Sequence, residues 1–231
     1  MLVIGHRGAA GLAPENTLEA IEAGIEAGAD IIEIDVRATK DNKLVLIHDS
    51  RLLRTHHSRE TVARLTYAEL QTHTKDKPIP LLSEVLDEYF GRILLNIELK
   101  SRGSSTLLIE LLEKKYIKKA ADWDNILISS FMGYELTRVR RLAKNANLAM
   151  LHNQNPFIFV AYHRFIGLTA VGFHRLYLNN LAIEIAKRAK LFMFVYTVDR
   201  SGSLRHLANQ GMEGAVTNYP DRIAKALEKL S

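Results

Sequence analysis

The sequence predicts an α/β fold, a TIM-type (β/α)8 barrel with a β-hairpin and a short insertion after its second strand. Short apolar runs alternate with segments of helical period almost from end to end of the chain, and eight of these runs qualify as strands. The length of 231 residues is close to the ~250 residues typical of such barrels. A doubly wound open sheet is the alternative, although no GxGxxG motif follows the first strand.

Eight apolar runs are expected to form the parallel strands of the barrel. In chain order they are Leu2–Ile4, Ile31–Val36, Ile93–Leu99, Ile126–Ser129, Leu148–Leu151, Ala170–Phe173, Phe192–Val198 and Ala215–Thr217. Leu44–Ile47 is predicted to be an additional strand, joined to the second strand by a turn at Asp41 and Asn42. This hairpin interrupts the regular alternation of strand and helix.

Segments of helical period separate most of the strands. We expect helices over Thr17–Ala27, Leu82–Tyr89, Ser105–Lys119, Tyr134–Lys144, Leu181–Lys190 and Ile223–Leu230. Asn16 and Glu19 have the spacing of a capping box at the start of the first helix. Residues 51–80 are a polar excursion, and we place a short insertion at about 49–90 on the face where the βα loops gather. No linker or repeat divides the chain, so residues 1–231 are predicted to form one barrel domain.

The composition is that of an ordinary globular protein that can build a sizeable core, with 47% hydrophobic and 25% charged residues. Because the chain has no cysteine, disulfides and thiolate chemistry are excluded. A formal net charge of +5 favours anionic ligands such as phosphates. No nucleic-acid-binding motif, secretion signal or apolar stretch of ~18 residues is present. We therefore expect a cytoplasmic protein with no nucleic-acid partner and no stable membrane anchor; nothing in the sequence specifies its oligomeric state.

The first candidate functional groups lie on the first two strands. His6 and Arg7 directly follow Leu2–Ile4, which places an imidazole able to transfer protons beside a guanidinium able to bind phosphate. Glu33 and Asp35 alternate along the second strand, so both carboxylates project from the same face. Such carboxylates repel each other unless a cation lies between them, and a hard divalent metal is the simplest such cation. One exposed and one salt-bridged carboxylate is the other interpretation of this pair.

The predicted hairpin brings a second histidine to these carboxylates. If the hairpin closes through a two-residue turn, Lys40 pairs with Lys43, and His48 then lies opposite Asp35 on the same face. His48 also ends its strand much as His6 ends the first one. The register alone therefore predicts that the two histidines and the carboxylate pair share one end of the barrel.

The third strand adds three polar side chains on one face, those of Asn96, Glu98 and Lys100. Burying them is costly without partners, and Glu98 as a third metal ligand beside Lys100 as a phosphate-neutralising cation would supply such partners. A purely structural Glu98–Lys100 ion pair is the alternative. Two histidines beside a metal and cations suit phosphodiester cleavage, in which one takes a proton from the nucleophile and the other protonates the leaving oxygen. The metal and Arg7 would stabilise the charge of the pentacovalent phosphorus.

The chain also resembles the glycerophosphodiester phosphodiesterases of the small bacterial type. The resemblance runs through nearly the whole chain, and its order and spacing are more specific than any single motif. It rests on the segments Gly5–Gly8, Ala13–Thr17, Glu33–Val36, Thr39–Asp41, His48–Asp49, Leu53–Thr55, Ile79–Leu86, Asn96–Lys100, Ser129–Phe131, Tyr196–Val198 and Gly214–Pro220.

This resemblance implies a TIM-type barrel and a metal-binding hydrolase of glycerol and lipid metabolism. The reaction it implies is hydrolysis of glycerophosphodiesters, its small-molecule substrates, to sn-glycerol 3-phosphate and an alcohol, with a divalent metal ion, Mg2+ or Ca2+. The residues implied are His6 and His48 as acid and base, Glu33, Asp35 and Glu98 as metal ligands, Arg7 and Lys100 at the phosphate, and Glu15 as a residue that orients them. The chain departs from the family pattern at Tyr196, Asp199 and residues 56–77, and these changes bear on the choice of head group.

Two other functions remain open at the level of sequence. A lysophospholipase D would need an apolar rim around the barrel mouth, for which Phe131, Phe157–Phe159 and Phe165 are the candidates. A non-catalytic barrel that binds anions through its positive charge is the other, but simple anion binding would require neither Glu33 nor Asp35. Which histidine is the acid, and whether water or the substrate's own 2-hydroxyl attacks phosphorus, is left open by the sequence.

Overall fold

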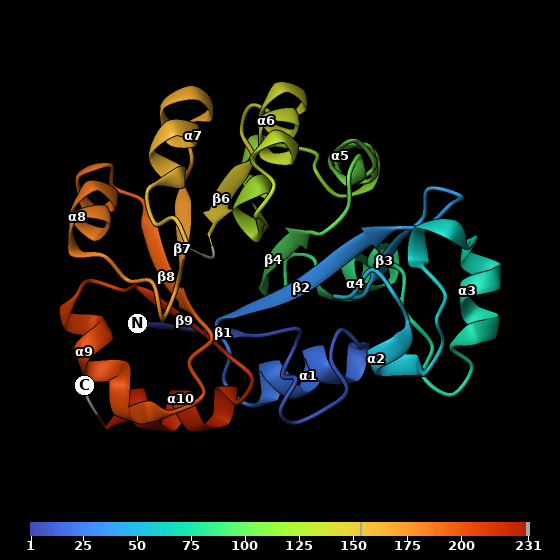
Figure 1. Cartoon of the computed structure of the whole chain (residues 1–231), viewed down its shortest axis with the longest axis horizontal. Coiled ribbons are helices and arrows are strands. Elements are labelled where there is room, and N and C mark those ends of the chain that lie inside the picture. Colours follow the sequence, from blue (N-terminus) through green and yellow to red (C-terminus); the bar gives the residue numbers. More distant parts are fainter. Residues whose placement is uncertain (153, 230–231) are drawn as a thin grey trace.

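The computed structural model of the protein describes residues 1–152 and 154–229, and a nine-stranded sheet forms its centre (Figure 1). Eight parallel strands close into a barrel because β1 pairs with both β2 and β9, and the extra strand β3 (Leu44–Leu46) pairs antiparallel with β2. The barrel strands are β1 (Leu2–Gly5), β2 (Ile31–Ala38), β4 (Leu94–Leu99), β5 (Ile126–Ser130), β6 (Asn147–Leu151), β7 (Ala170–His174), β8 (Phe192–Tyr196) and β9 (Gly214–Thr217). The predicted TIM-type barrel with a hairpin after its second strand is confirmed.

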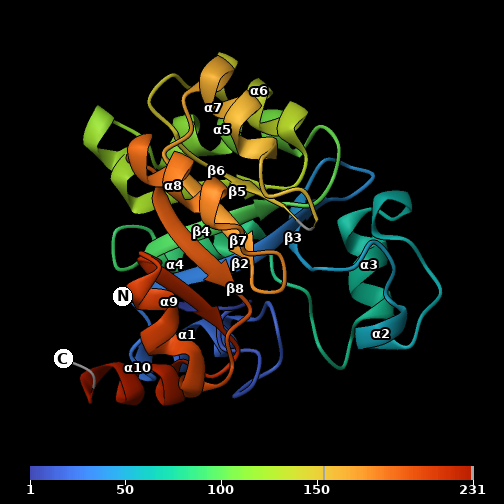
Figure 2. The same cartoon turned by 60° about the vertical axis from the view of Figure 1, so that its left-hand side comes forward.

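Helices surround the barrel and cover the outer face of its strands (Figures 1 and 2). They are α1 (Leu18–Glu26), α4 (Leu82–Tyr89), α5 (Ser104–Lys115), α6 (Gly133–Leu142), α7 (Ile158–Ile166), α8 (Asn180–Arg188), α9 (Leu204–Asn209) and α10 (Pro220–Glu228), with 3₁₀ turns at Ala120–Asn125 and Ser201–Ser203. The sequence analysis did not predict α7 and α9, and the predicted end of the last helix, Leu230, lies outside the described residues. Within those residues, no helix has the length and apolarity needed to cross a membrane.

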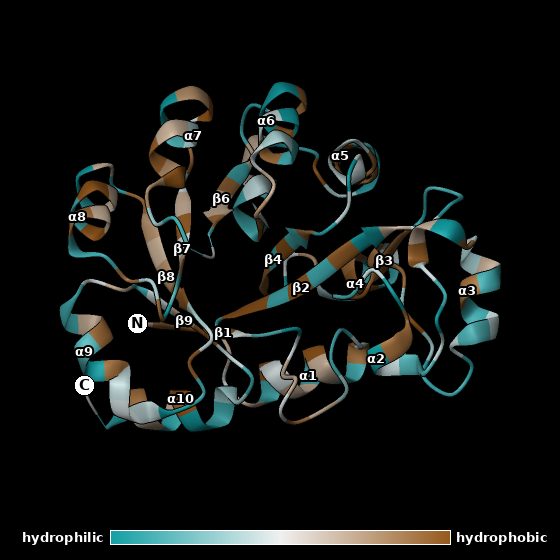
Figure 3. Cartoon of the chain, in the orientation of Figure 1, coloured by the Kyte–Doolittle hydropathy of each residue, from teal (hydrophilic) through white to brown (hydrophobic). Residues whose placement is uncertain are grey.

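Two apolar layers stabilise the barrel. The larger lies between the strands and the helices, and brown stretches of apolar residues appear on both in Figure 3. The smaller fills the barrel with Ile4, Ile31, Leu127, Ala149, Leu151, Ala170, Phe194 and Val216. Each large aliphatic or aromatic side chain buried in these layers contributes about 1.5–3 kcal/mol relative to an exposed one.

The insertion after β3 has a small core of its own. It contains α2 (Leu53–His56), a 3₁₀ turn at Val62–Arg64 and α3 (Tyr67–His73), and both helices stand beside the barrel in Figures 1 and 2. This core consists of Val45, Ile47, Leu52, Val62, Leu65, Leu70 and Ile79. Because Val45 and Ile47 belong to or adjoin β3, the insertion packs on the hairpin rather than on the barrel helices.

The hairpin register differs by one residue from the prediction. Val36 pairs with Leu46 and Ala38 with Leu44, so Asp35 lies opposite Ile47 and not opposite His48. The loop has three residues rather than two because Asn42 adopts a left-handed conformation with φ of 60°. A one-residue shift turns every side chain to the other face. His48 still reaches the site because it follows the end of the strand.

The predicted capping box at the start of α1 is wrong. Thr17 is the N-cap, and its side-chain oxygen accepts a hydrogen bond from Ala20 N over 3.1 Å. Asn16 instead has a φ of 58° and directs its amide toward the barrel. The residue expected to cap the helix therefore serves the site described below.

Gly8 allows the β1–α1 loop to pass directly against α1. A Cβ on Gly8 would lie 2.5 Å from the carbonyl carbon of Ala20, and the φ of Gly8 is +86°. We expect Gly8→Ala to lower the free energy of unfolding by about 2–5 kcal/mol, since the conformation costs about 1–2 and the overlap about 1–3. Gly91→Ala is the control, because Gly91 has a φ of +80° but no atom of the described residues within 4 Å of its Cβ position. Urea unfolding would measure the loss of unfolding free energy in both variants. Equal losses would show that contact with α1 does not require a glycine at position 8.

Candidate active site

Three carboxylates meet where β2 and β4 run side by side. The parallel register pairs Glu33 with Asn96 and Asp35 with Glu98, so their side chains share the inner face of the barrel. One oxygen from each of Glu33, Asp35 and Glu98 lies within 4.8 Å of the others, and all three residues are buried. An all-oxygen cluster of this kind could bind a hard divalent metal ion.

The electrostatics of the cluster call for a cation. Burial, together with the negative charges of Asp35 and Glu98, raises the pKa of Glu33 well above its usual value. Burial also raises the pKa of Glu98 to about 7, against the opposing effect of Lys100. Glu33 Oε1 is buried and has no hydrogen-bond partner among the described residues. A free buried carboxylate oxygen facing two more carboxylates fits a metal ligand better than a structural ion pair.

Two basic side chains border the carboxylates. Lys100 Nζ lies 2.6 Å from Glu98 Oε1 and 3.2 Å from Asp35 Oδ1, and Arg7 Nε lies 3.1 Å from Asp35 Oδ2. Burial opposes ionisation of Asp35, but Lys100 and Arg7 outweigh it and keep its pKa below the ordinary value. The Glu98–Lys100 pair expected as a structural alternative is therefore present, but it belongs to the same cluster as the other two carboxylates.

Arg7 and Asn16, both in the loop after β1, form hydrogen bonds with carboxylates of the cluster. Arg7 has a φ of 52°, and its backbone N–H donates to Glu33 Oε2 over 2.8 Å. Asn16 Nδ2 donates to Asp35 Oδ2, and Asn16 Oδ1 accepts from Asp35 N, each over 2.9 Å. Sequence analysis missed this role of Asn16. Its position beside Glu15 in the Ala13–Thr17 segment is the only sequence signal that could have suggested it.

His6 is oriented by a chain of two side chains from the opposite end of the sequence. Its Nδ1 lies 2.7 Å from Asn218 Oδ1, and Asn218 Nδ2 donates to Asp199 Oδ2 over 2.9 Å. Because the Asp199 carboxylate only accepts hydrogen bonds, the amide nitrogen of Asn218 must face it and the amide oxygen must face His6. His6 Nδ1 therefore donates its proton, and Nε2 is the nitrogen free for chemistry.

His48 has a carboxylate partner instead. Its Nδ1 lies 2.7 Å from Asp49 Oδ1, so Nδ1 again carries the proton and Nε2 is free. The guanidinium of Arg37 fixes the backbone below it, with Nε donating to the carbonyl oxygen of His48 over 2.8 Å. Burial lowers the pKa of both His6 and His48, and the charge of Arg7 adds to this effect at His6.

Asn218 offers a test of the orientation of His6. We expect Asn218→Leu to lower kcat about 10–100-fold, because the imidazole loses the acceptor that fixes its tautomer. KM and the melting temperature should change little, since the side chain is partly exposed to solvent. Steady-state kinetics with a glycerophosphodiester would check this, and an unchanged kcat would contradict it.

These groups open into one cavity of about 180 Å3 at the mouth of the barrel. It is lined by His6, Arg7, Glu33, His48, Asn96, Glu98, Lys100, Phe131, Leu151, Phe194, Tyr196, Thr197 and Val216. Six of the seven predicted site residues thus line it, and the seventh, Asp35, is 1% exposed and forms ion pairs with Arg7 and Lys100. The hydroxyl of Tyr196 donates to the carbonyl oxygen of His152, so it contributes a ring to the cavity wall rather than a free donor.

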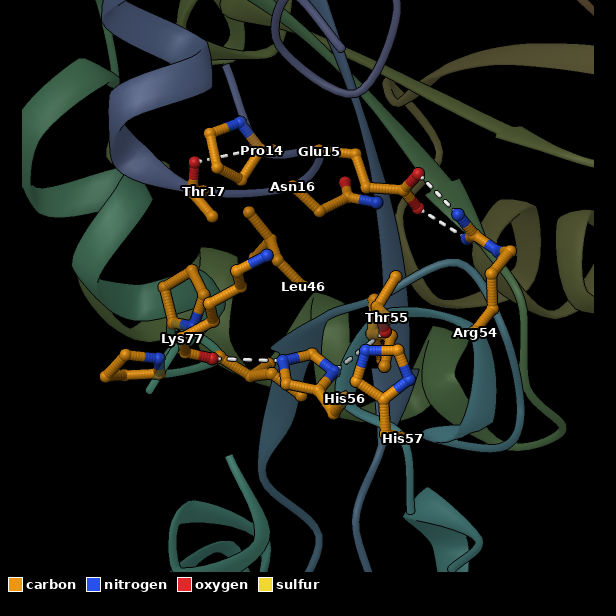
Figure 4. Close-up of a pocket in the computed structure, with 14 residues that line it drawn as sticks. Pro14, Glu15, Asn16, Thr17, Leu46, Arg54, Thr55, His56, His57 and Lys77 are labelled. Atoms are coloured by element: carbon orange, nitrogen blue, oxygen red, sulfur yellow. Dashed lines mark hydrogen bonds and ion pairs between the residues drawn. The ribbon is translucent and has the colours of Figure 1, made fainter. Parts of the chain in front are cut away.

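A second cavity of about 270 Å3 lies between the β1–α1 loop and the insertion (Figure 4). Glu15 and Arg54 line it and form two hydrogen bonds with each other, whereas Arg7 and His48 line the first cavity. Because Glu15 also forms an ion pair with Arg7, the Glu15–Arg54 pair connects the candidate site to the insertion.

Comparison of the chain with known proteins shows which family it belongs to. The model of the glycerophosphoryl diester phosphodiesterase family matches residues 6–222. The chain belongs to this family. It is thus a phosphoric diester hydrolase, and the resemblance inferred from the sequence is confirmed. A glycerophosphodiester phosphodiesterase of Caldanaerobacter subterraneus is 30% identical, with 99% of this chain and 98% of that one covered. One from Bacillus altitudinis is 31% identical, with 99% and 98% covered.

Solved structures of the family share the fold. The crystal structure of a glycerophosphodiester phosphodiesterase from Thermotoga maritima superimposes on this one with a TM-score of 0.84. The two sequences are 26% identical, and the match covers 97% of each chain. A phosphodiesterase of Oleispira antarctica, solved in complex with the product sn-glycerol-3-phosphate, is 24% identical, with a TM-score of 0.85 and 99% and 97% of the two chains covered.

Proposed function

We propose that this phosphodiesterase hydrolyses glycerophosphodiesters to sn-glycerol 3-phosphate and an alcohol, with His6 and His48 as its acid–base pair. The observation that carries the proposal is the shared cavity, which is lined by two histidines with free Nε2 atoms, two cations and two carboxylates of the cluster, Glu33 and Glu98. The name of the Oleispira antarctica complex, which contains this product, supports the choice of substrate class.

The partners of the two histidines support different roles. Burial lowers the pKa of His48, but the hydrogen bond to Asp49 opposes this effect and stabilises the imidazolium, which suits the general acid. His6 faces the neutral amide oxygen of Asn218 and lies next to Arg7, which favours the neutral imidazole of a general base. In this assignment His6 Nε2 takes the proton of the attacking group, water or the substrate's own 2-hydroxyl, as its oxygen bonds to phosphorus. If the 2-hydroxyl attacks, water must afterwards open the cyclic phosphate to give sn-glycerol 3-phosphate. His48 Nε2 then protonates the alcohol oxygen as its bond to phosphorus breaks.

The remaining site residues would neutralise the negative charge of the phosphate group. Arg7 and Lys100 would bind the phosphate oxygens, since both side chains are cationic, flank Asp35 and line the cavity. Glu33, Asp35 and Glu98 would bind the metal ion, Mg2+ or Ca2+, and the set of three carboxylate oxygens fits either. When bound, the ion would stabilise the negative charge that develops on the phosphoryl group.

A lysophospholipase D would need an apolar rim around the barrel mouth, and only some of the candidate residues for it are exposed. Of the candidate residues, Phe159 is 1% exposed and belongs to the core, whereas Phe157 in the loop between β6 and α7 is 37% exposed. Phe165, near the C-terminal end of α7, is 82% exposed. Phe131 does line the cavity, where Lys100 Nζ lies 5.5 Å from the centre of its ring. The charged and polar lining of the cavity favours a small polar diester, and the exposed Phe157 leaves a lysophospholipid as the alternative substrate.

One comparison of substrates tests the proposal. The purified protein would receive glycerophosphocholine or lysophosphatidylcholine, with Mg2+, with Ca2+ or with EDTA, and released sn-glycerol 3-phosphate and choline would be measured. We expect glycerol 3-phosphate from glycerophosphocholine only when a metal is present. Preferential cleavage of lysophosphatidylcholine would favour the lysophospholipase D, and no turnover of either diester would contradict the proposed function.

A further inference from the structure

Arg54 lies on α2 in the insertion, and its guanidinium bonds two carboxylates at once. Nη1 and Nη2 donate to Glu15 Oε2 and Oε1 over 2.7 and 2.6 Å (Figure 4), and Nε donates to Asp49 Oδ2 over 2.6 Å. A parallel pair of bonds on one carboxylate and a third bond on another require the planar fork of arginine. The chain therefore uses the full geometry of this side chain and not only its charge.

Each of the two carboxylates also holds one residue of the proposed active site. Glu15 Oε1, which accepts from Arg54, accepts from Arg7 Nη1 as well, over 2.9 Å. The second oxygen of Asp49 faces His48 Nδ1 at 2.7 Å. Arg54 thus begins two chains of contacts, which are called arms below. One runs through Glu15 to Arg7, the proposed phosphate-binding cation, and the other through Asp49 to His48, the proposed general acid.

We propose that Arg54 is a positioning residue of the phosphodiesterase reaction, which keeps Asp49 against His48 and Glu15 against Arg7. This inference rests on the proposed function, because it matters only if His48 and Arg7 act on the substrate. No residue of α2 lines the cavity of the barrel mouth, so the arms through Glu15 and Asp49 are the contacts by which this helix reaches the reacting groups.

The exposure of the network separates a positioning role from a structural one. The side chains of Arg54 and Asp49 are 48% and 30% exposed, and Glu15 is 21% exposed. Ion pairs this open to water contribute little to folding stability. The same openness leaves the Asp49 carboxylate free to turn toward solvent once Arg54 is removed, and His48 Nδ1 then loses its fixed acceptor. Loss of Arg54 should therefore affect kcat far more than it affects the fold.

The test compares Arg54→Ala, Arg54→Lys and the control Arg59→Ala, which removes another exposed cation from the same insertion. With glycerophosphocholine we expect Arg54→Ala to lower kcat about 10–100-fold, by analogy with the loss seen when the hydrogen-bond partners of metal-binding histidines are removed. Lysine supplies the charge without the fork, so Arg54→Lys should recover only a small part of the loss. Arg59→Ala should match the wild-type protein, and the melting temperatures of all variants should agree closely.

Nitrogen-15 spectra of the His48 imidazole give a readout that does not depend on turnover. We expect Nδ1 to be protonated in the wild-type protein and the two tautomers to mix in Arg54→Ala. Combining Arg54→Ala with Asp49→Asn should cost little more than the worse single change, because both break one arm.

Wild-type kcat in Arg54→Ala, full recovery by Arg54→Lys, or an unchanged His48 spectrum would overturn the inference. If the wild-type protein itself failed to hydrolyse the diester, the proposed function would fall, while the spectrum would still report on the Arg54–Asp49–His48 arm.

Discussion

His6→Ala is expected to lower kcat for glycerophosphocholine about 10³-fold, within the range of 10²–10⁴ associated with a single proton-transfer group. The side chain is half-buried and lines the cavity, and its Nε2 is the nitrogen directed away from its partner Asn218. Alanine leaves the hydroxyl that attacks phosphorus without a base. KM should change much less, since Arg7 and Lys100 remain to bind phosphate. His206→Ala is the matched control, because it removes an exposed histidine on α9.

A change of leaving group distinguishes His6 from His48. The p-nitrophenyl ester of glycerol phosphate releases a phenolate that needs no proton, so the general acid becomes dispensable. We expect His48→Ala to regain most of its activity with this ester, while His6→Ala stays inactive with both substrates. The reverse pattern would exchange the two roles, and equal losses on both esters in both variants would contradict the acid–base division.

The sequence sufficed for the barrel and for much of the candidate site for a simple physical reason. Parallel barrel strands are buried on both faces, so they read as apolar runs, and a polar residue that interrupts such a run stands out. Glu33, Asp35 and Glu98 interrupt β2 and β4 at alternate positions, which places them on one face whatever the exact strand ends. Their clustering therefore followed from local pattern and from the adjacency of two strands.

What escaped prediction depends on loop conformation or on contacts distant in sequence. The hairpin register depended on a single left-handed residue, Asn42, which the two-residue turn model did not include. The predicted register placed His48 beside the carboxylates, but this register is wrong. His48 lies at the site because the chain continues toward it beyond the end of β3. Asn218 is 212 positions from His6, and Arg54 is 39 from Glu15. No periodicity links residues so far apart, so only the folded structure shows these partners.

Glu33→Gln is expected to separate the metal site from the fold. Glu33 Oε2 accepts from the backbone of Arg7, while Oε1 is buried without a partner among the described residues. A glutamine preserves the first contact and replaces a buried carboxyl whose ionisation is opposed by burial and by two other carboxylates. The metal-free variant should therefore melt at or above the temperature of the metal-free wild-type protein. Its kcat should fall about 10³-fold, because the stabilisation of phosphoryl charge by the ion is lost.

Titration with Mg2+ and Ca2+ provides the decisive measurement. A ligand that binds only the folded state stabilises it by about 2.7 kcal/mol at 100 times its Kd. In a protein of this size that corresponds to a rise of about 5–10 °C in the melting temperature. We expect this rise in the wild-type protein and its loss in Glu33→Gln.

Glu135→Gln is the matched control. Its buried carboxylate accepts from Gly103 N and Ser105 N over 2.7 and 3.0 Å, so the amide should lower stability yet leave the metal-induced rise intact. A metal-induced rise that survives in Glu33→Gln would remove Glu33 from the ligand set. If it survived even in the triple Gln/Asn variant of Glu33, Asp35 and Glu98, the ion would bind elsewhere, and the buried charge of the cluster would need a structural explanation.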